Sequence, residues 1–291
     1  MDSPLLAAPD WFVEAATPIC AAIGLPTFAP VVHLAFVSCF LSFSIQYISS
    51  FISPKLFPKY YPTLKAKRDD WDLHVVGWAY SLVATPLALA LILNPSKELL
   101  VDPLYGWAVR EARLSAIATG YFVWDTKVSA QHIGTQGLGF LAHGLGCGAA
   151  FAFTLRPFLL YCGPDFLIWE LSTIFLNVHW FCDKFQMTGS TLQLINGGFL
   201  ILAYVGARLI WGTYNSVMLI KLLFGAGSNP DVGFLRYFYV VVNVGLNSLN
   251  LFWFRAMVLA LKKRFVKADP NAKNEVIAID GKLNWKGKKT E

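Results

Sequence analysis

Seven long apolar stretches divide this sequence and limit what the chain can fold into. They run at roughly 31–52, 73–94, 112–129, 136–155, 158–182, 192–224 and 234–261. A helix needs about 20 apolar residues to cross the hydrocarbon core of a bilayer, where the backbone must satisfy its own hydrogen bonds. The pattern therefore predicts an all-α integral membrane protein with about seven transmembrane helices. The stretch at 192–224 is longer than a bilayer requires, and we expect it to bend at Gly206 or to continue along the interface.

The composition agrees with this prediction. Hydrophobic residues make up 56% of the chain and charged residues 14%, whereas soluble domains average about 25% charged residues. Too few polar side chains are present to cover a soluble globule. The length of 291 residues leaves no room for a separate soluble domain beside the helices.

Basic residues mark two segments that should share one side of the membrane. The connection after the first stretch holds five of them, nearly all of the net charge of +6 lies between residues 262 and 291, and residues 1–30 contain no Lys or Arg. Short loops rich in Lys and Arg stay in the cytosol, so an odd number of spans places the N-terminus in the lumen and the C-terminus in the cytosol. The five basic residues of the connection are Lys55, Lys59, Lys65, Lys67 and Arg68.

This orientation divides the chain into four expected parts. They are a lumenal N-terminal segment (1–30), a first helix with its cytosolic loop (31–64), a helical membrane domain (65–262) and a basic cytosolic tail (263–291). A basic tail beside a membrane span is typical of contact with anionic lipid headgroups, and we expect no nucleic-acid partner.

The last four residues, Lys288-Lys289-Thr290-Glu291, carry lysines at the third and fourth positions from the end. Retrieval signals of endoplasmic reticulum membrane proteins have this form. They are addresses that cytosolic coat proteins read, and they do not anchor the chain. A chance pair in a lysine-rich tail is the alternative. Because the charge pattern independently places the tail in the cytosol, it favours the signal and an endoplasmic reticulum location.

Five ionisable residues stand out within the predicted spans. Each costs at least about 2.5 kcal/mol at that depth and is therefore a functional candidate with a partner, so we expect a bundle with a polar interior. At about 1.5 Å of rise per residue, three of them should reach the cytosolic half together with Asn196. These three are Asp125, His143 and His179; Glu170 is expected near mid-depth and Arg208 closer to the lumen.

His143 lies between Phe140-Leu141-Ala142 and Gly144-Leu145-Gly146, which leaves room beside its ring for a chain-like ligand. An imidazole titrates near neutral pH and can act as a general base or carry an acyl group. A core histidine that donates to a neighbouring helix explains the same pattern equally well, and the sequence leaves both interpretations open.

Other polar residues favour structural roles. Glu170 and Asn177 are seven residues apart and share one helix face. Interhelical hydrogen bonding is favoured for Asn177 and Ser172, while a functional role stays open for Glu170 and His179. Residues spaced at i, i+4 and i+7 in the last stretch are expected to bond to neighbouring helices: Asn243, Asn247 and Asn250. The five cysteines show no metal-binding spacing, so we expect no metal site.

Five groups of residues occur in a specific order between about 65 and 262. They are Lys67-Arg68-Asp69-Asp70-Trp71, Gly120-Tyr121-Phe122-Val123-Trp124-Asp125, Phe140-Leu141-Ala142-His143, Glu170-Leu171-Ser172-Thr173 with Phe175-Leu176-Asn177, and Ile195-Asn196-Gly197 followed by Ala207-Arg208. In order and spacing they resemble the TLC-domain family, which includes the ceramide synthases. The chain looks most like the small TLC-domain transmembrane proteins linked to lipid homeostasis, in a fungal-type version.

The resemblance implies an endoplasmic reticulum protein in which six helices form a barrel around a lipid or acyl-chain cavity. In the ceramide synthases, a His-His pair at the position of His143 transfers an acyl group from acyl-coenzyme A to an amine, with acidic residues nearby. This sequence departs from that pattern at three positions, because Gly144 replaces the second histidine, Tyr80 a histidine of the second span, and Ile174 a proline. One histidine still allows a base or an acyl carrier.

Two functional hypotheses follow. In the first, the protein acts in lipid metabolism and transfers a fatty acyl chain from acyl-coenzyme A to an amphiphile such as a lysophospholipid or a sphingoid base. His143 is then the base or acyl carrier, Asp125 fixes its tautomer, and Lys127 or the basic loop attracts the coenzyme phosphates. Acyl-coenzyme A would be a co-substrate, and no cofactor would be bound permanently.

In the second hypothesis, the protein is a non-catalytic lipid-binding or cargo-sorting protein. Its polar interior selects a lipid, and coat proteins read the tail through Lys288 and Lys289. Membrane lipids and fatty acyl chains are the expected partners in both cases, and a homodimer is compatible with the sequence. The candidate lipid-binding residues are Tyr80, Glu170, Asn177, His179, Asn196 and Arg208.

Overall fold

The computed structural model describes residues 1, 3–225 and 233–265. Long helices dominate this part of the chain, and it contains no strand. The long helices are α2 (Val32–Leu56), α3 (Lys65–Leu93), α5 (Val109–Gln131), α7 (Leu138–Thr154), α9 (Glu170–Lys184), α10 (Thr191–Ala203), α11 (Gly212–Phe224) and α12 (Gly233–Phe265). Shorter helices lie before and between them: α1 (Asp10–Ala22), α4 (Lys97–Val101), α6 (Ile133–Gln136) and α8 (Gly163–Leu167).

The helices have the length and surface of a membrane protein. Four of the described helical segments are long and apolar enough to span a bilayer, namely Val32–Leu56, Lys65–Leu93, Thr191–Phe224 and Gly233–Lys262. On α2, Phe36 and Phe40 are 68% and 71% exposed, which is costly in water and favourable in lipid. The predicted all-α integral membrane fold is confirmed. The remaining expected spans correspond to α5, which carries several charges, to the shorter α7, and to α8 with α9.

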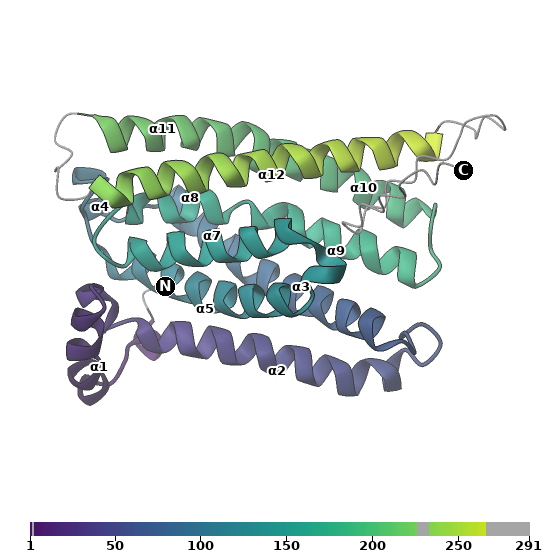
Figure 1. The fold of residues 1–291 in the computed structure, drawn as a ribbon, viewed down its shortest axis with the longest axis horizontal. Coiled ribbons are helices and arrows are strands. Elements are labelled where there is room, and N and C mark those ends of the chain that lie inside the picture. The colour runs from purple at the N-terminus through teal and green to yellow at the C-terminus, as the bar shows by residue number, and fades with distance from the viewer. Residues whose placement is uncertain (2, 226–232, 266–291) are drawn as a thin grey trace, which may run out of the picture.

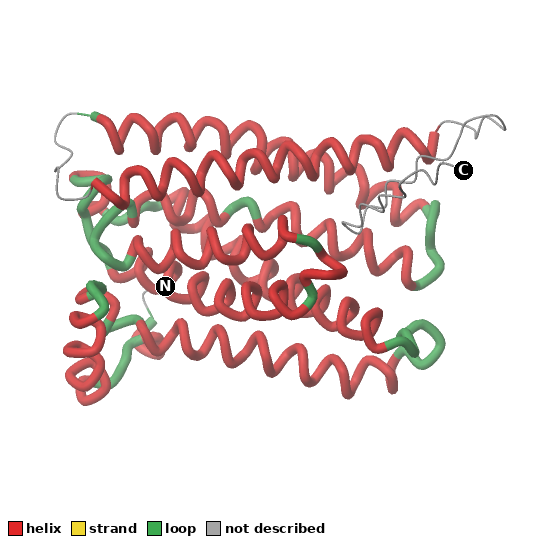
Figure 2. Tube along the Cα trace, viewed as in Figure 1, coloured by secondary structure: helices red, strands yellow, loops and turns green. Residues whose placement is uncertain are grey.

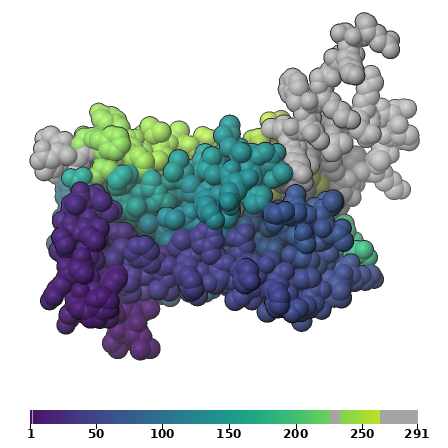
Figure 3. Space-filling view, turned by 60° about the horizontal axis from the view of Figure 1, so that its bottom comes forward, coloured from purple at the N-terminus to yellow at the C-terminus, as the bar shows by residue number. Residues whose placement is uncertain are grey.

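The long helices run side by side along the longest axis of the molecule (Figures 1 and 2). α1 lies across one end, where it projects beyond the helical body in the space-filling view (Figure 3). The α2–α3 loop and the end of α12 lie at the opposite end (Figure 1). We call this second end, which carries Lys55, Lys59, Lys65, Lys67 and Arg68, the basic end. The loop and the end of the last helix therefore lie at the same end of the bundle, as the charge pattern predicts.

The predicted continuous span at 158–182 is wrong. Leu159 adopts the left-handed conformation with φ of 60°, the short α8 follows, and α9 begins only at Glu170. Pro157 disfavours a helical conformation at the residue before it, and Pro164 suits the first turn of a new helix. Hydropathy does not reveal this break because the turns are as apolar as the helices.

The stretch at 192–224 is helical throughout but irregular where the sequence predicts a bend. Between α10 and α11, the segment Tyr204–Trp211 forms a π-helix that contains Gly206. A π-helix bonds each N–H to the carbonyl five residues back and is frequent at functional positions. The segment carries Arg208 into the interior of the bundle, where the side chain is 6% exposed.

Helix α5 is the central element and packs against both α2 and α7. Small residues allow the close approach: a Cβ atom at Gly120 would collide with the carbonyl oxygen of Ala35 on α2. On the other side of α5, a Cβ at Gly148 of α7 would lie 3.3 Å from Cβ of Phe122. Small residues at helix interfaces are the usual means of tight packing in membranes.

Candidate functional site

An apolar cavity lies inside the bundle, between α5, α7, α8, α11 and α12. It has a volume of about 70 Å³, which is below the roughly 300 Å³ at which ligand pockets usually begin. Most of its lining is aliphatic or aromatic. The polar side chains that reach it include His143, Cys147, Glu170 and Asn243. The cavity can therefore hold the reactive end of an apolar ligand, with an imidazole and a carboxyl group in the same space.

His143 reaches this cavity from α7 and is half-buried. Its Nδ1 atom lies 3.7 Å from Sγ of Cys147, one turn along the same helix. Phe122 of α5 and Trp253 of α12 pack edge-on against the ring, with centroid distances of 5.8 Å and 5.6 Å. Contacts from three helices fix the position of the imidazole, which is what a catalytic or ligand-binding group requires.

Asp125 contacts the residue next to His143 along the chain. An ideal Cβ at Gly144 would lie 2.6 Å from Oδ2 of Asp125 and 3.1 Å from the backbone nitrogen of Thr126. Among the described residues, no hydrogen bond or ion pair joins Asp125 to His143; the carboxylate interacts electrostatically with Glu170 instead. The proposed control of the His143 tautomer by Asp125 stays a prediction without a supporting contact.

The position of Asp125 explains why a second histidine is not compatible with this packing. We expect Gly144→His to lower the free energy of unfolding by about 1–3 kcal/mol, because the new Cβ meets a carboxylate and a backbone atom that cannot move independently. Thermal unfolding in detergent measures the change. Gly146→Ala on the same helix is the matched control, since its Cβ would meet Val242 at an ordinary 3.5 Å. A fully stable Gly144→His protein would show that α5 and α7 separate easily.

Arg208 and Glu170 belong to one buried network. Arg208 donates from Nε to the carbonyl oxygen of Trp169 at 3.1 Å and to Oγ of Ser172 at 2.8 Å. Its Nη1 and Nη2 atoms donate to Oδ1 of Asn250 at 3.0 Å and to Oγ1 of Thr173 at 3.3 Å. Arg208 also interacts electrostatically with Glu170, which is 6% exposed.

This network joins the start of α9, the π-helical segment and α12. It gives Ser172 and Asn250 the interhelical roles that their positions predict. Asn247 has a similar role, because its Nδ2 donates to Oγ of Ser216 on α11 at 3.0 Å.

Tyr80 lies in the interior, where the family resemblance expects a histidine. Its ring stacks on Tyr121 of α5 with a centroid distance of 3.5 Å and an interplanar angle of 2°. The Tyr80 side chain is buried, and within the described chain its hydroxyl has no hydrogen-bond partner. Both tyrosines interact electrostatically with Asp125 and Glu170. The aromatic pair thus forms a wall beside the two interior carboxyl groups.

The sequence reasoning missed His74 of α3. Its Nδ1 donates to Oδ1 of Asn177 at 2.7 Å, and its ring stacks on Trp180 with a centroid distance of 3.9 Å. Asn177 in turn donates to the carbonyl oxygen of Thr173, one turn earlier on α9, at 2.8 Å, so His74 is the partner through which it bonds to another helix. The signal in the sequence is the position of His74 inside the apolar stretch 73–94.

His179 and Asn196 do not join His143 at the cavity, contrary to the expected convergence. They lie where α9 packs on α10. Asn196 donates to the carbonyl oxygen of Phe175 at 2.8 Å, and a Cβ at Gly197 would lie 3.5 Å from Cε1 of His179. Gln193 of α10 adds to the same contact, because its Nε2 donates to Oδ1 of Asp183 on α9 at 2.6 Å.

The remaining predicted positions are peripheral. Lys127 is exposed, and its ammonium lies 4.4 Å from the ring centroid of Phe43 on α2, outside the cavity lining. Lys288 and Lys289 lie outside the described residues. Within the part of the chain that the structure describes, no group of three or more His, Cys, Asp or Glu side chains is arranged to hold a metal ion.

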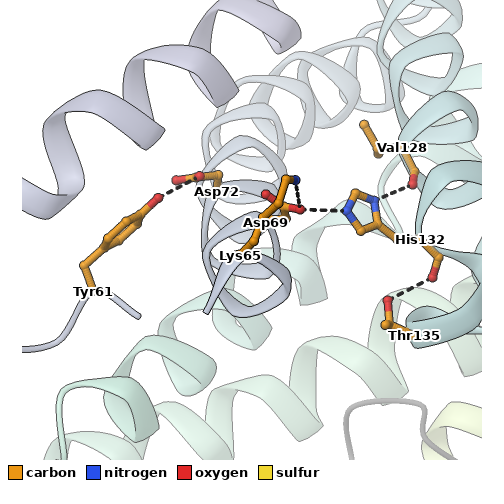
Figure 4. Close-up of polar contacts among 7 residues, drawn as sticks. All are labelled: Tyr61, Lys65, Asp69, Asp72, Val128, His132 and Thr135. Carbon is orange, nitrogen blue, oxygen red and sulfur yellow. Dashed lines mark hydrogen bonds and ion pairs between the residues drawn. The ribbon is translucent and has the colours of Figure 1, made fainter. Parts of the chain in front are cut away.

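Acidic residues of α3 organise the basic end (Figure 4). Asp69 accepts from Lys65 at 2.6 Å and from Nε2 of His132 at 3.3 Å, and Nδ1 of His132 donates to the carbonyl oxygen of Val128 at 2.9 Å. Tyr61 donates to Oδ2 of Asp72 at 3.0 Å. Burial and the Asp72 carboxylate raise the pKa of Tyr61, so the phenol keeps its proton. These contacts fix the α2–α3 loop and the end of α5.

Comparisons with known proteins complete this description. The profile of the TLC domain matches residues 70–259. An uncharacterised TLC domain-containing protein of Schizosaccharomyces pombe is 34% identical over 252 residues, which is 86% of each chain. Topoisomerase I damage affected protein 4 of Saccharomyces cerevisiae is 26% identical and covers 82% of this chain and 86% of its own. TLC domain-containing protein 4-A of Xenopus laevis is 29% identical, and the match covers 80% of this chain and 92% of the Xenopus protein. No solved structure matches the chain significantly.

Proposed function

Because this chain belongs to the TLC-domain family of membrane proteins, we propose that it acts in lipid metabolism as an acyl-coenzyme-A-dependent acyltransferase. Family membership implies a lipid-related function in a membrane. The observation that supports the finer proposal is the position of His143, which faces an apolar interior cavity that Glu170 also lines. The acceptor would be an amphiphile with a hydroxyl or amino group, such as a lysophospholipid or a sphingoid base.

The proposed reaction uses His143 as a general base. The imidazole takes the proton of the acceptor group while the oxygen or nitrogen of that group attacks the thioester carbonyl. The carbon–sulfur bond then breaks, and the coenzyme A thiolate leaves and recovers the proton from His143. The apolar lining excludes water, which would otherwise hydrolyse the thioester. Because the cavity volume is about 70 Å³, the rest of the acyl chain must enter between the helices.

The same proposal includes an endoplasmic reticulum location with a cytosolic C-terminus and a lumenal N-terminus. The charges of the basic end support this orientation. They would also attract the phosphates of acyl-coenzyme A, together with Lys127 on the outer face of α5. Lys288 and Lys289 would supply the retrieval signal that coat proteins read.

We expect His143→Ala to reduce acyl transfer at least about 100-fold, since a general base contributes that much or more. The assay uses the purified full chain in detergent with acyl-coenzyme A and a broad panel of acceptors, and native mass spectrometry detects co-purified lipid or an acyl adduct. His33→Gln is the control, because His33 contacts the carbonyl oxygen of Leu6 near the other end of α2. If the wild-type protein transfers no acyl group to any acceptor, the enzymatic proposal is wrong.

One observation favours a second candidate, a non-catalytic lipid-binding or sorting protein. Asp125 packs against Gly144, and no contact joins it to His143 among the described residues, so the imidazole has no orienting carboxylate. In this case His143→Ala would retain co-purified lipid and function in cells as well as wild type does. Replacement of both Lys288 and Lys289 by alanine would then disrupt function by changing the location of the protein.

A further inference from the structure

A second and larger apolar groove, separate from the interior cavity, lies between α2, α3 and α9. Its volume is about 530 Å³, which is within the range of pockets that hold small-molecule ligands. Helix α3 forms its floor, where Trp71, Val75 and Trp78 share one face. Helices α2 and α9 form its walls. Neither His143 nor Glu170 lines this groove, so it is separate from the cavity of the proposed catalytic residues.

The two serine hydroxyls that line the bottom of the groove already have hydrogen-bond partners. Ser49 and Ser53 of α2 reach the lining, but Ser49 donates to Oδ1 of Asp72 at 2.6 Å and Ser53 accepts from Nε1 of Trp71 at 3.2 Å. Asp72 is buried and also accepts from Tyr61 (Figure 4). The buried part of an occupant must therefore be apolar. Ile48 and Ile52 at the rim are 51% and 42% exposed, so the groove opens sideways, where a membrane protein meets lipid.

Aromatic rings close the groove at the basic end. Phe57 follows α2 and Phe185 follows α9, and their centroids are 5.1 Å apart. Trp71 contacts both rings, at 6.0 Å and 5.6 Å. Tyr60 packs on Phe185 at 5.3 Å. Aromatic clusters of this kind lie at the level of lipid headgroups, so an occupant can continue from the apolar groove into a polar interface.

Three lysines lie on the segments that carry this aromatic cluster. Lys55 follows Ile48 and Ile52 on the same face of α2, Lys59 lies in the loop after α2, and Lys184 is the last residue of α9. Their ammonium groups lie over neighbouring rings, Lys55 over Phe51 at 3.7 Å, Lys59 over Tyr60 at 5.4 Å and Lys184 over Trp180 at 4.3 Å, and of these rings only Tyr60 belongs to the cluster.

In the described chain none of these lysines pairs with a carboxylate, and their N–H groups can donate to an anion. The neighbouring Asp69 and Asp183 have donors of their own, in Lys65 and Gln193 respectively.

We propose that this groove binds an anionic phospholipid, with one acyl chain between α2 and α9 and the headgroup phosphate at Lys55, Lys59 and Lys184. The apolar depth selects a hydrocarbon chain, and the lysines select a negative headgroup over a zwitterionic one. The lipid would fill the space between α2, which precedes the TLC domain, and α9, which belongs to it.

The test compares phosphatidylserine with phosphatidylcholine of the same acyl chains, added to the purified full-length protein in detergent and counted by native mass spectrometry. We expect the wild type to prefer phosphatidylserine. The double variant Lys55→Gln/Lys184→Gln should bind it about thirtyfold more weakly, at about one kcal/mol for each lysine, with little change for phosphatidylcholine. Lys97→Gln, an exposed lysine at the other end of the bundle, should change neither affinity.

A second variant tests the acyl-chain site. Val178→Trp places an indole in the groove and should release both lipids, whereas Leu176→Trp, on the same helix but outside the lining, should release neither. Thermal unfolding of each variant identifies loss of fold. If Val178→Trp unfolds, the double variant Lys55→Gln/Lys184→Gln decides the test alone. Equal binding of the two lipids by the wild type would overturn the proposal, as would phosphatidylserine binding that a folded Val178→Trp protein retains.

Discussion

Replacement of Arg208 by leucine is expected to have the largest effect on stability of any single change in this protein. The variant removes four hydrogen bonds that join α9, the π-helical segment and α12, and each such bond in a membrane is worth about 0.6 kcal/mol. It also removes a positive charge that interacts electrostatically with the buried Glu170. The four lost bonds amount to about 2.4 kcal/mol, and the buried acceptors left without a donor cost about 1–3 kcal/mol more, so we expect little folded protein in detergent.

Two further variants separate charge from geometry in this network. Arg208→Lys should recover only part of the stability, because an ammonium cannot reproduce the planar fork of a guanidinium. Glu170→Gln combined with Arg208→Leu should be more stable than Arg208→Leu alone, since no buried charge is left uncompensated. Arg255→Gln is the control, as Arg255 is exposed on α12. Thermal unfolding and size-exclusion profiles report the outcome; a stable Arg208→Leu protein would mean that the network contributes little.

The second large effect is expected at Gly120. A methyl group there would meet the carbonyl oxygen of Ala35 at a distance that real contacts do not allow, and a backbone atom cannot rotate away as a side chain can. Gly120→Ala should therefore push α2 away from α5 and lower the free energy of unfolding by at least about 1–3 kcal/mol. Gly120→Val should lower the free energy of unfolding further, because its side chain is larger.

Thermal unfolding measures this effect against a matched glycine. Gly198→Ala in α10 has no atom within 4 Å of the new Cβ, and it should be neutral or stabilising because alanine favours a helix. Equal stability of Gly120→Ala and Gly198→Ala would contradict the close packing of α2 on α5.

The sequence predicts the class of fold because apolar length alone determines it in a membrane. The long helices α2, α3 and α12 lie close to their predicted ranges. The break between Leu159 and Glu170 could not be recognised in the same way, because Phe158, Leu159 and Leu160 are apolar in a turn as they would be in a helix. Only Pro157 and Pro164 indicated it.

The direction in which each candidate side chain points could not be predicted from the sequence. Counting residues gives the height of Asp125, His143, His179 and Asn196 along the membrane normal, and it does not give the rotation of each helix about its own axis. That rotation places His143 at the cavity and His179 at the contact with α10. Similarly, the sequence shows that Gly144 replaces a family histidine, but only packing shows that Asp125 fills the space.

The π-helical segment Tyr204–Trp211 also determines the direction in which the residues after it face. A wide turn holds more residues than an α-helical turn, and each additional residue rotates all later faces by about 100°. The faces of α10 and α11 therefore belong on two separate helical wheels, although the hydropathy of 192–224 is that of one segment. Loss of one residue from the wide turn would rotate Leu219 and Leu223 out of the cluster around Phe158. The length of this segment thus keeps the two halves of the helix facing their respective neighbours.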